Sequence, residues 1–205
     1  MATGKISLLK TSNNLSGFTL LEVLLVLAIL GGIIGFGLPR MRSPQTNVRA
    51  VARQLSALAR EVRNEARMKR MTYRIVFRMS ENKDEYWVEN AAGNYIIPSQ
   101  TTIEKTQSLD EKDRPGSPFH KVDKYSKKEK ELPGTLHFGS IETTSTLRPI
   151  TSGVAYIYFT PEGLTEQSVV QITDRKKITW SLIFNPITGH ADIVEKAISL
   201  KDIYN

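Results

Sequence analysis

The sequence lacks cysteine altogether and has only three histidines among its 205 residues. The absence of cysteine excludes disulfides, thiolate zinc sites and cysteine nucleophiles. His120, His137 and His190 lie far apart in the sequence, which argues against a histidine-rich metal site. The chain also shows no phosphate-binding loop and no spaced nucleophile and base. We therefore expect no catalytic residue, no metal and no cofactor. A membrane-anchored hydrolase that uses scattered acids is the one enzymatic alternative.

Positive charge is unevenly distributed along the chain. The net charge is +7, from 28 Lys and Arg against 21 Asp and Glu. Between Arg40 and Arg78, eleven Lys and Arg stand against two acids, Glu61 and Glu65, and the rest of the chain is slightly acidic. A basic balance permits nucleic acid or an anionic membrane as a partner without identifying either. One segment therefore carries the basic character.

A single long apolar run extends from Phe18 to Leu38, and Glu22 is its one charged residue. At about 1.5 Å per residue this run reaches roughly 30 Å as a helix, the thickness of a bilayer core. Two interpretations are open: a secretory signal peptide that is removed, or a retained membrane anchor, which fits the length better. A carboxylate inside a membrane costs about 2.5–3.5 kcal/mol and usually marks a function. Alternatively, Glu22 lies near the helix end and snorkels to the interface.

The apolar run begins with a specific motif, Gly17-Phe18-Thr19-Leu20-Leu21-Glu22. The motif resembles the cleavage and methylation site of type IV prepilins and type II secretion pseudopilins. The resemblance implies that a prepilin peptidase removes the leader 1–17 by cutting between Gly17 and Phe18, and that Phe18 is then N-methylated. It also implies assembly with other pilin or pseudopilin subunits through the helix 18–38, which would be transmembrane before it forms the filament core.

The same resemblance implies a location. It places the chain in the bacterial inner membrane as a single-pass protein with a periplasmic C-terminal domain, later incorporated into a pilus or pseudopilus. Lys5 and Lys10 precede the apolar run, whereas four arginines follow it within 15 residues. By the positive-inside rule alone, the C-terminal side would be cytoplasmic. The periplasmic orientation therefore depends on the resemblance.

The spacing within the motif has a physical explanation. Glu22 lies four residues after Phe18 and therefore on the same helix face. When such helices bundle in an apolar core, the Phe18 ammonium and the Glu22 carboxylate each need a partner. In the family, Glu22 of one subunit is thought to meet the Phe18 amine of its neighbour. Gly31 and Pro39 weaken the end of the helix, since glycine costs about 1 kcal/mol and proline about 3 kcal/mol, so we predict flexibility there.

Residues 46–71 have the periodicity of an amphipathic helix. Apolar residues recur every three or four positions, at Val48, Val51, Ala52, Leu55, Leu58, Ala59, Val62 and Ala66. A separate stripe of arginines is offset by roughly 100° and consists of Arg49, Arg53, Arg60, Arg63, Arg67 and Arg70. We predict that the apolar face packs on a sheet. The arginine stripe is left for water, a neighbouring subunit, lipid headgroups or nucleic acid.

Strand patterns follow this helix. The candidates are 72–79, 86–89, 135–141, 154–159, 168–173, 178–184 and 191–195. Residues 99–131 are instead rich in charge and show no periodicity, and they predict a polar, solvated, mobile insertion. One long helix followed only by strands predicts an α+β, pilin-like fold with an antiparallel sheet against the helix. The predicted parts are 1–17, 18–38, 39–71, 72–98, 99–131 and 132–205.

Two turn sequences in the C-terminal half refine the resemblance. They are Phe159-Thr160-Pro161-Glu162-Gly163 and Asn185-Pro186-Ile187-Thr188-Gly189-His190. Together they resemble the GspH/FimT group of minor pilins and pseudopilins. The resemblance implies a minor subunit of a type II secretion or type IV pilus-like filament.

Two alternatives to that function are open. A FimT-like minor pilin would bind DNA for uptake through Arg175, Lys176 and Lys177, which loosely resemble the short basic motif of such proteins. That binding would be salt-dependent and blind to sequence. The other alternative is a plain membrane-anchored periplasmic protein that never enters a filament.

Overall fold

The computed structural model describes residues 19–37, 44–97, 116–125, 129–146, 148–176 and 178–204. The chain divides into two compact units, residues 1–42 and 43–205, and each is described by itself. Four predicted site residues lie outside the described residues, namely Gly17, Phe18, Pro39 and Lys177.

The described part of the first unit forms one helix, α1, from Leu20 to Gly37. Its sequence is apolar apart from Glu22 in the first turn, and it continues through Gly31 and Gly32. All the large apolar side chains of residues 20–30 are exposed in the isolated chain. An exposed apolar surface of this kind marks a site of interaction with other proteins or with a membrane. Within the part of the chain that the structure describes, no helix combines the length and apolar character needed to span a membrane.

The second unit begins with α2, from Pro44 to Lys69. Pro44 fits the first turn, where a helix has no use for the missing backbone N–H. The predicted apolar face is confirmed, because all eight of its residues are buried. The described helical residues end at Gly37 and resume at Pro44, so the predicted continuity of the helix across residues 38–43 lies outside the described residues.

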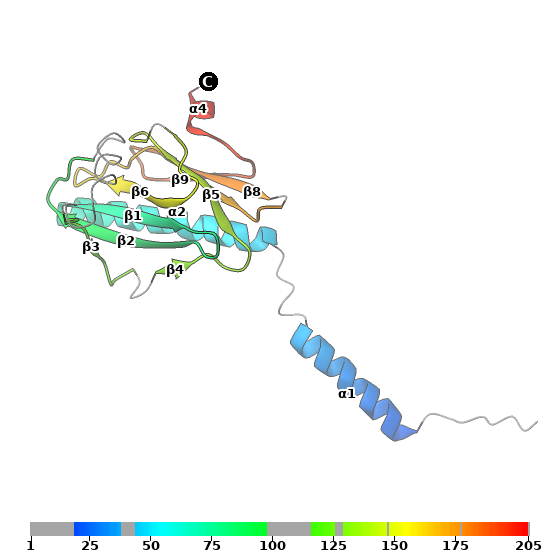
Figure 1. Cartoon of the computed structure of the whole chain (residues 1–205). Coiled ribbons are helices and arrows are strands. Elements are labelled where there is room, and N and C mark those ends of the chain that lie inside the picture. Colours follow the sequence, from blue (N-terminus) through cyan, green and yellow to red (C-terminus); the bar gives the residue numbers. More distant parts are fainter. Residues whose placement is uncertain are drawn as a thin grey trace, which may run out of the picture. The chain divides into compact units, whose positions relative to one another are not determined.

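The strands of the second unit are all paired antiparallel, so the predicted α+β class is confirmed. They form two sheets rather than the one we expected, with the orders β3-β2-β1-β6, in which β4 also pairs with β2, and β5-β7-β8-β9. The strands are β1 Met71–Met79, β2 Glu85–Ala92, β3 His120–Lys121, β4 Lys130–Glu131, β5 His137–Thr143, β6 Gly153–Phe159, β7 Ser168–Thr173, β8 Thr179–Phe184 and β9 Ala191–Val194. Figure 1 shows α2 lying along these sheets.

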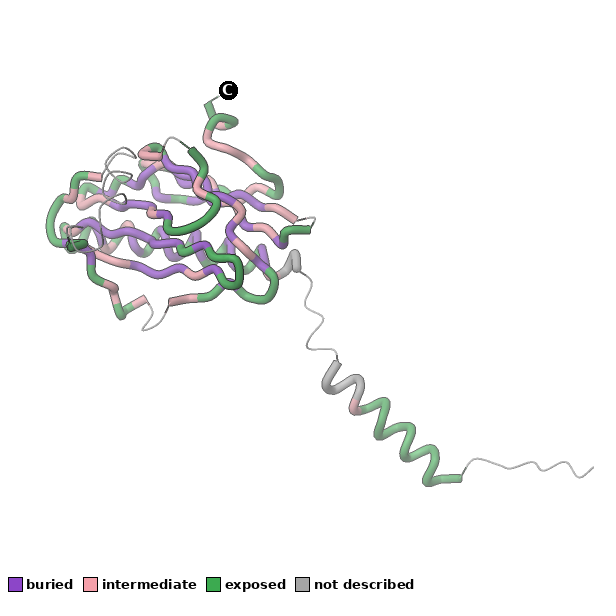
Figure 2. Tube along the Cα trace, in the orientation of Figure 1, coloured by how far each residue is buried: buried purple, intermediate pink, exposed green. Residues whose placement is uncertain are grey.

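The core lies between α2 and the two sheets, and α2 contacts strands of both. In Figure 2 the buried positions follow the strands and the inner face of α2. Phe77 of β1 meets Phe138 of β5 edge to face, with ring centroids 5.1 Å apart, and so joins the two sheets. The turn after β1 adds a polar link, because the buried Asp84 carboxylate accepts hydrogen bonds from the N–H groups of Ser80 (2.9 Å) and Phe138 (2.7 Å).

Part of the predicted insertion 99–131 differs from the prediction. Residues 116–125 pack on the domain, where Phe119 is buried against Tyr95 and Tyr158. The Lys124 ammonium lies 3.2 Å from Glu61 Oε1 and 2.5 Å from Glu65 Oε1 on α2. Hydrogen bonds from Lys124 and then Lys69 lower the pKa of Glu65 below its usual value. A few aromatic and ionic anchors thus hold a stretch whose overall composition is that of a solvated loop.

Near the end of the chain, a short helix, α4, extends from Leu200 to Ile203 where no element was predicted. The N–H of Ser199 donates to the Asp202 carboxylate at 2.8 Å, which caps the helix.

Candidate functional site

The described part of the N-terminal motif is the first turn of α1. The backbone N–H of Glu22 donates to Thr19 Oγ1 at 3.3 Å, and both residues are exposed. A carboxylate in the first turn lies at the positive end of the helix dipole, where negative charge is favoured. In an otherwise apolar helix, Glu22 is the one ionisable group available to fix how neighbouring helices align. Its pairing with the Phe18 amine stays a prediction, because Phe18 lies outside the described residues.

The arginines of the stripe on α2 make different kinds of contact. Arg63 Nε donates to the carbonyl oxygen of Gly163 at 2.6 Å, and its Nη2 donates to that of Ile187 at 2.7 Å. Arg49 instead lies 3.2 Å from Glu195 Oε1 and 5.6 Å from the centroid of the Trp180 ring. The expectation that the whole stripe faces outward is therefore wrong for Arg63, which links α2 to two turns of the C-terminal half.

These two turns are the family-like sequences 159–163 and 185–190. Gly163 has φ +84° and Gly189 has φ +64°, a conformation that favours glycine. A Cβ at Gly189 would lie 2.3 Å from Arg63 Cδ. The Asn185 side chain accepts the N–H groups of Ile187 and Thr188, each at 3.0 Å, which fixes the second turn locally. Glycine is thus required where Arg63 reaches between the turns.

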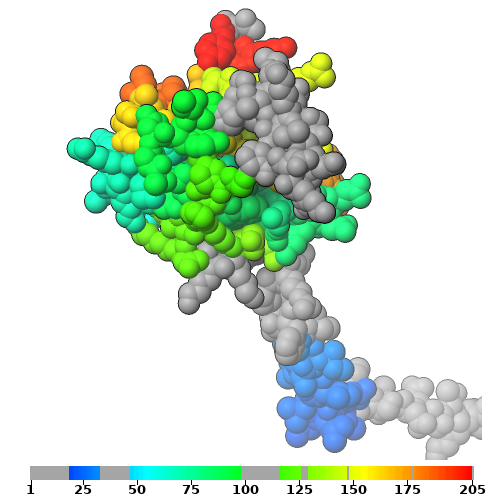
Figure 3. All heavy atoms as spheres, turned by 60° about the vertical axis from the view of Figure 1, so that its left-hand side comes forward, coloured from blue at the N-terminus to red at the C-terminus, as the bar shows by residue number. Residues whose placement is uncertain are grey.

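Figure 3 brings the end of the domain at which α2 finishes to the front. The cyan end of α2 lies beside yellow and orange surface from the C-terminal half, in agreement with the Arg63 contacts. The Asn94 side-chain amide donates to Glu162 Oε1 at 3.0 Å, so the segment after β2 joins the same end. Four parts of the sequence, far apart along the chain, therefore meet there.

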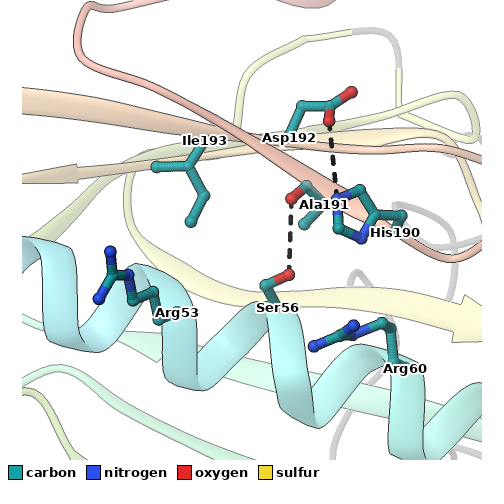
Figure 4. Close-up of a pocket in the computed structure, with 7 residues that line it drawn as sticks. All are labelled: Arg53, Ser56, Arg60, His190, Ala191, Asp192 and Ile193. Carbon is teal, nitrogen blue, oxygen red and sulfur yellow. Dashed lines mark hydrogen bonds and ion pairs between the residues drawn. The ribbon is translucent and has the colours of Figure 1, made fainter.

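A groove of about 410 Å³ lies between α2 and β9. As Figure 4 shows, Arg53, Ser56 and Arg60 line it from α2, and His190 and Asp192 approach from the C-terminal side. The Ser56 hydroxyl donates to the Ala191 carbonyl oxygen at 3.5 Å. His190 Nε2 lies 3.8 Å from Asp192 Oδ1. The two arginines are exposed and form no ion pair within the part of the chain that is described, so the groove has a cationic helix side.

The predicted DNA-binding residues lie in the turn between β7 and β8. Asp174 Oδ1 accepts the N–H groups of Lys176 and Ile178, each at 2.9 Å. Arg175 has φ +59° and is exposed, as is Lys176. Asp174 thus organises a turn that holds two cations outward. Among the residues described, no three histidine, aspartate or glutamate side chains are grouped as metal ligands.

Comparison with known proteins identifies one feature. Residues 12–31 match the prokaryotic N-terminal methylation motif, and no curated protein and no solved structure matches the chain. The motif is the type IV pilin signal, so the chain is type IV pilin-like and is processed by a prepilin peptidase. Proteins of this kind are structural filament subunits, not enzymes, and the motif indicates a membrane-anchored subunit that assembles with other pilin subunits.

Proposed function

We propose that this type IV pilin-like chain is a minor pilin or pseudopilin of a type II secretion or type IV pilus-like filament. It is made in the bacterial inner membrane with residues 44–204 on the periplasmic side. The observation that carries the proposal is α1, an exposed apolar helix whose one charge is Glu22 in the first turn, inside the methylation motif. A helix of that composition can bundle with like helices, and Glu22 can register them.

The C-terminal turns support a minor subunit of the GspH/FimT kind. Both turn sequences are built around Arg63, which donates to one carbonyl oxygen in each. Because one side chain bridges the two turns, they form a single structural unit. Their joint occurrence therefore supports the resemblance to this group more strongly than two unrelated turns would. The N-terminal motif alone does not assign the chain to this group, so the assignment is a proposal that depends on the two turns.

The first experiment is intact-mass and N-terminal peptide analysis of the protein from its native membranes. We expect a chain that begins at N-methylated Phe18, because the peptidase cleaves after Gly17. The same preparation, sheared and pelleted, should contain the chain in the filament fraction. A chain that keeps its leader while the peptidase is active would contradict the proposal and favour a plain membrane-anchored protein.

DNA capture is a second candidate function, and the β7–β8 turn favours it because Arg175 and Lys176 are held exposed. If it holds, changing Arg175, Lys176 and Lys177 to Gln should weaken binding to mixed-sequence duplex DNA. A plot of the logarithm of the association constant against the logarithm of the salt concentration has a negative slope. The magnitude of that slope should decrease by about 2.7, since each phosphate contact contributes about 0.9. Fluorescence anisotropy at several salt concentrations measures both.

A control with the same loss of charge distinguishes a site from general attraction. Arg148, Lys196 and Lys201 are exposed cations outside that turn, and changing all three to Gln should leave the salt slope nearly unchanged. Equal losses in the two triple variants would refute a binding site at the β7–β8 turn.

A further inference from the structure

A pocket of about 570 Å³ lies where loops from four parts of the second unit meet. Ile97 comes from the segment after β2, and Pro186 comes from the turn after β8. The rest of the lining comes from the segments that come after β5 and β6 in the sequence, and it contains hydroxyl groups and one carboxylate. These residues include Thr144, Ser145, Thr160 and Glu166. The pocket is separate from the α2–β9 groove, because the two share no lining residue.

Glu166 is the unusual member of this pocket. It lines the pocket although only 6% of its surface is exposed. Oε1 accepts the N–H of Ser145 at 3.0 Å. Oε2 is buried and has no hydrogen-bond partner among the described residues, and the same is true of the adjacent Thr165 hydroxyl. Buried polar atoms are normally paired, and an unpaired carboxylate oxygen is especially unfavourable.

The surroundings of Glu166 indicate what would pair with it. No lysine or arginine among the described residues forms an ion pair with this carboxylate. Ile97, Leu164 and Pro186 give the pocket an apolar part of its lining, and Leu164 is 50% exposed. A group that fits must be cationic at its tip and apolar along its stem. Lysine and arginine side chains have that construction.

We propose that the pocket receives a lysine or arginine side chain from a neighbouring filament subunit, with Glu166 as its ion-pair partner. The inference rests on the proposed function, since a filament supplies the neighbour. Entry of the cation, together with a shift of the Glu166 side chain that opens Oε2 to the pocket, completes the hydrogen bonding of this oxygen, and the apolar lining residues pack on the aliphatic stem. Because a buried carboxylate is strongly unfavourable without its partner, the pair selects subunits that present a cation at this place.

The test places a photo-crosslinking amino acid at Leu164, on the exposed part of the pocket, in the full-length chain in its native cells. In an otherwise unchanged chain, irradiation should join it to another filament subunit. Glu166→Gln keeps the acceptor for Ser145 but puts an amide in place of the free oxygen. The cross-link yield should then fall at least about ten-fold, because a tenfold loss needs only about 1.4 kcal/mol of lost ion-pair energy.

Glu162→Gln is the matched control. It makes the same chemical change at an exposed carboxylate four residues earlier, and the cross-link yield should stay unchanged. Thermal unfolding of both variants checks that they keep the fold. Leu164→Lys places a cation from the chain itself at the pocket, so it should also prevent binding of the neighbouring subunit, which co-purification measures. An unaffected yield in Glu166→Gln, or a cross-link only within the same chain, would overturn the inference. A chain that never enters filaments would instead contradict the proposed function, and the inference would fall with it.

Discussion

Glu22→Ala is expected to leave the chain cleaved and in the membrane but to lower its recovery in filaments about 100-fold. In the proposed assembly the Glu22 carboxylate pairs with the Phe18 ammonium of a neighbouring subunit. Removing one partner of a buried ion pair leaves the other charge uncompensated and costs about 3–5 kcal/mol, and about 3 kcal/mol already corresponds to a factor of 100. Immunoblots of the sheared filament fraction and of the membrane fraction measure the distribution, and intact mass verifies cleavage.

Two further variants separate charge from shape at this position. Glu22→Gln keeps the side-chain size and loses the charge, so it should fail to incorporate as Glu22→Ala does. Thr19→Val removes the hydroxyl that accepts the Glu22 N–H and leaves the carboxylate in place, so it should incorporate normally. If Glu22→Gln entered filaments as well as the unchanged chain, an ion pair would not be what registers the helices.

The sequence predicted those elements whose signal is local. The apolar face of α2 and the alternating residues of β1 are patterns within one segment, and each emerged within a few residues of its predicted bounds. The arrangement into two sheets was missed because pairing is not local. β6 pairs with β1, whereas β7, the next strand, pairs with β5. Nothing in the alternation of either strand says which neighbour it will choose.

Composition misled the prediction for part of 99–131. The stretch is rich in charge, yet residues 116–125 are fixed to the sheet by the buried Phe119 and by the pairing of β3 with β2, and to α2 by Lys124. Average composition conceals such anchors because it weights every residue equally. For Glu166, the sequence held no signal at all, since a pocket-lining glutamate with a buried, unpaired oxygen exists only after distant loops have met.

Arg63 is a site residue that sequence reasoning placed on the wrong surface. Six arginines recur at helical spacing, and their spacing alone does not distinguish the one that meets two carbonyl oxygens. The available signal was in the turns, where Gly163 and Gly189 follow prolines at short intervals. Glycine at positive φ beside a packed side chain is what a close approach demands. The turn sequences and the helix arginine should therefore be treated as one unit.

That unit leads to a stability prediction. Gly189→Ala should lower the free energy of unfolding by about 2–4 kcal/mol, because alanine at positive φ costs about 1–2 kcal/mol and the new Cβ displaces Arg63. Arg63 makes two hydrogen bonds, each worth about 1.5–3 kcal/mol when intact, and the displaced side chain is expected to weaken them rather than to lose both. Urea unfolding of the full chain in detergent micelles, followed by tryptophan fluorescence, measures the change.

The chain offers a matched control for the backbone contribution. Gly134 has nearly the same conformation, φ +68°, but a Cβ there would meet nothing within 4 Å. Gly134→Ala should therefore cost only the conformational part, about 1–2 kcal/mol. The excess at Gly189 is then the cost of displacing Arg63.

A double-mutant cycle completes the argument. In a chain that already carries Arg63→Ala, the Arg63 side chain is no longer there to be displaced, so Gly189→Ala should cost no more than Gly134→Ala does. The two changes at 63 and 189 would then be strongly non-additive, as expected for residues in direct contact. Additive losses would mean that Gly189 is required by the turn itself, and that Arg63 is held by the two carbonyl oxygens independently of it.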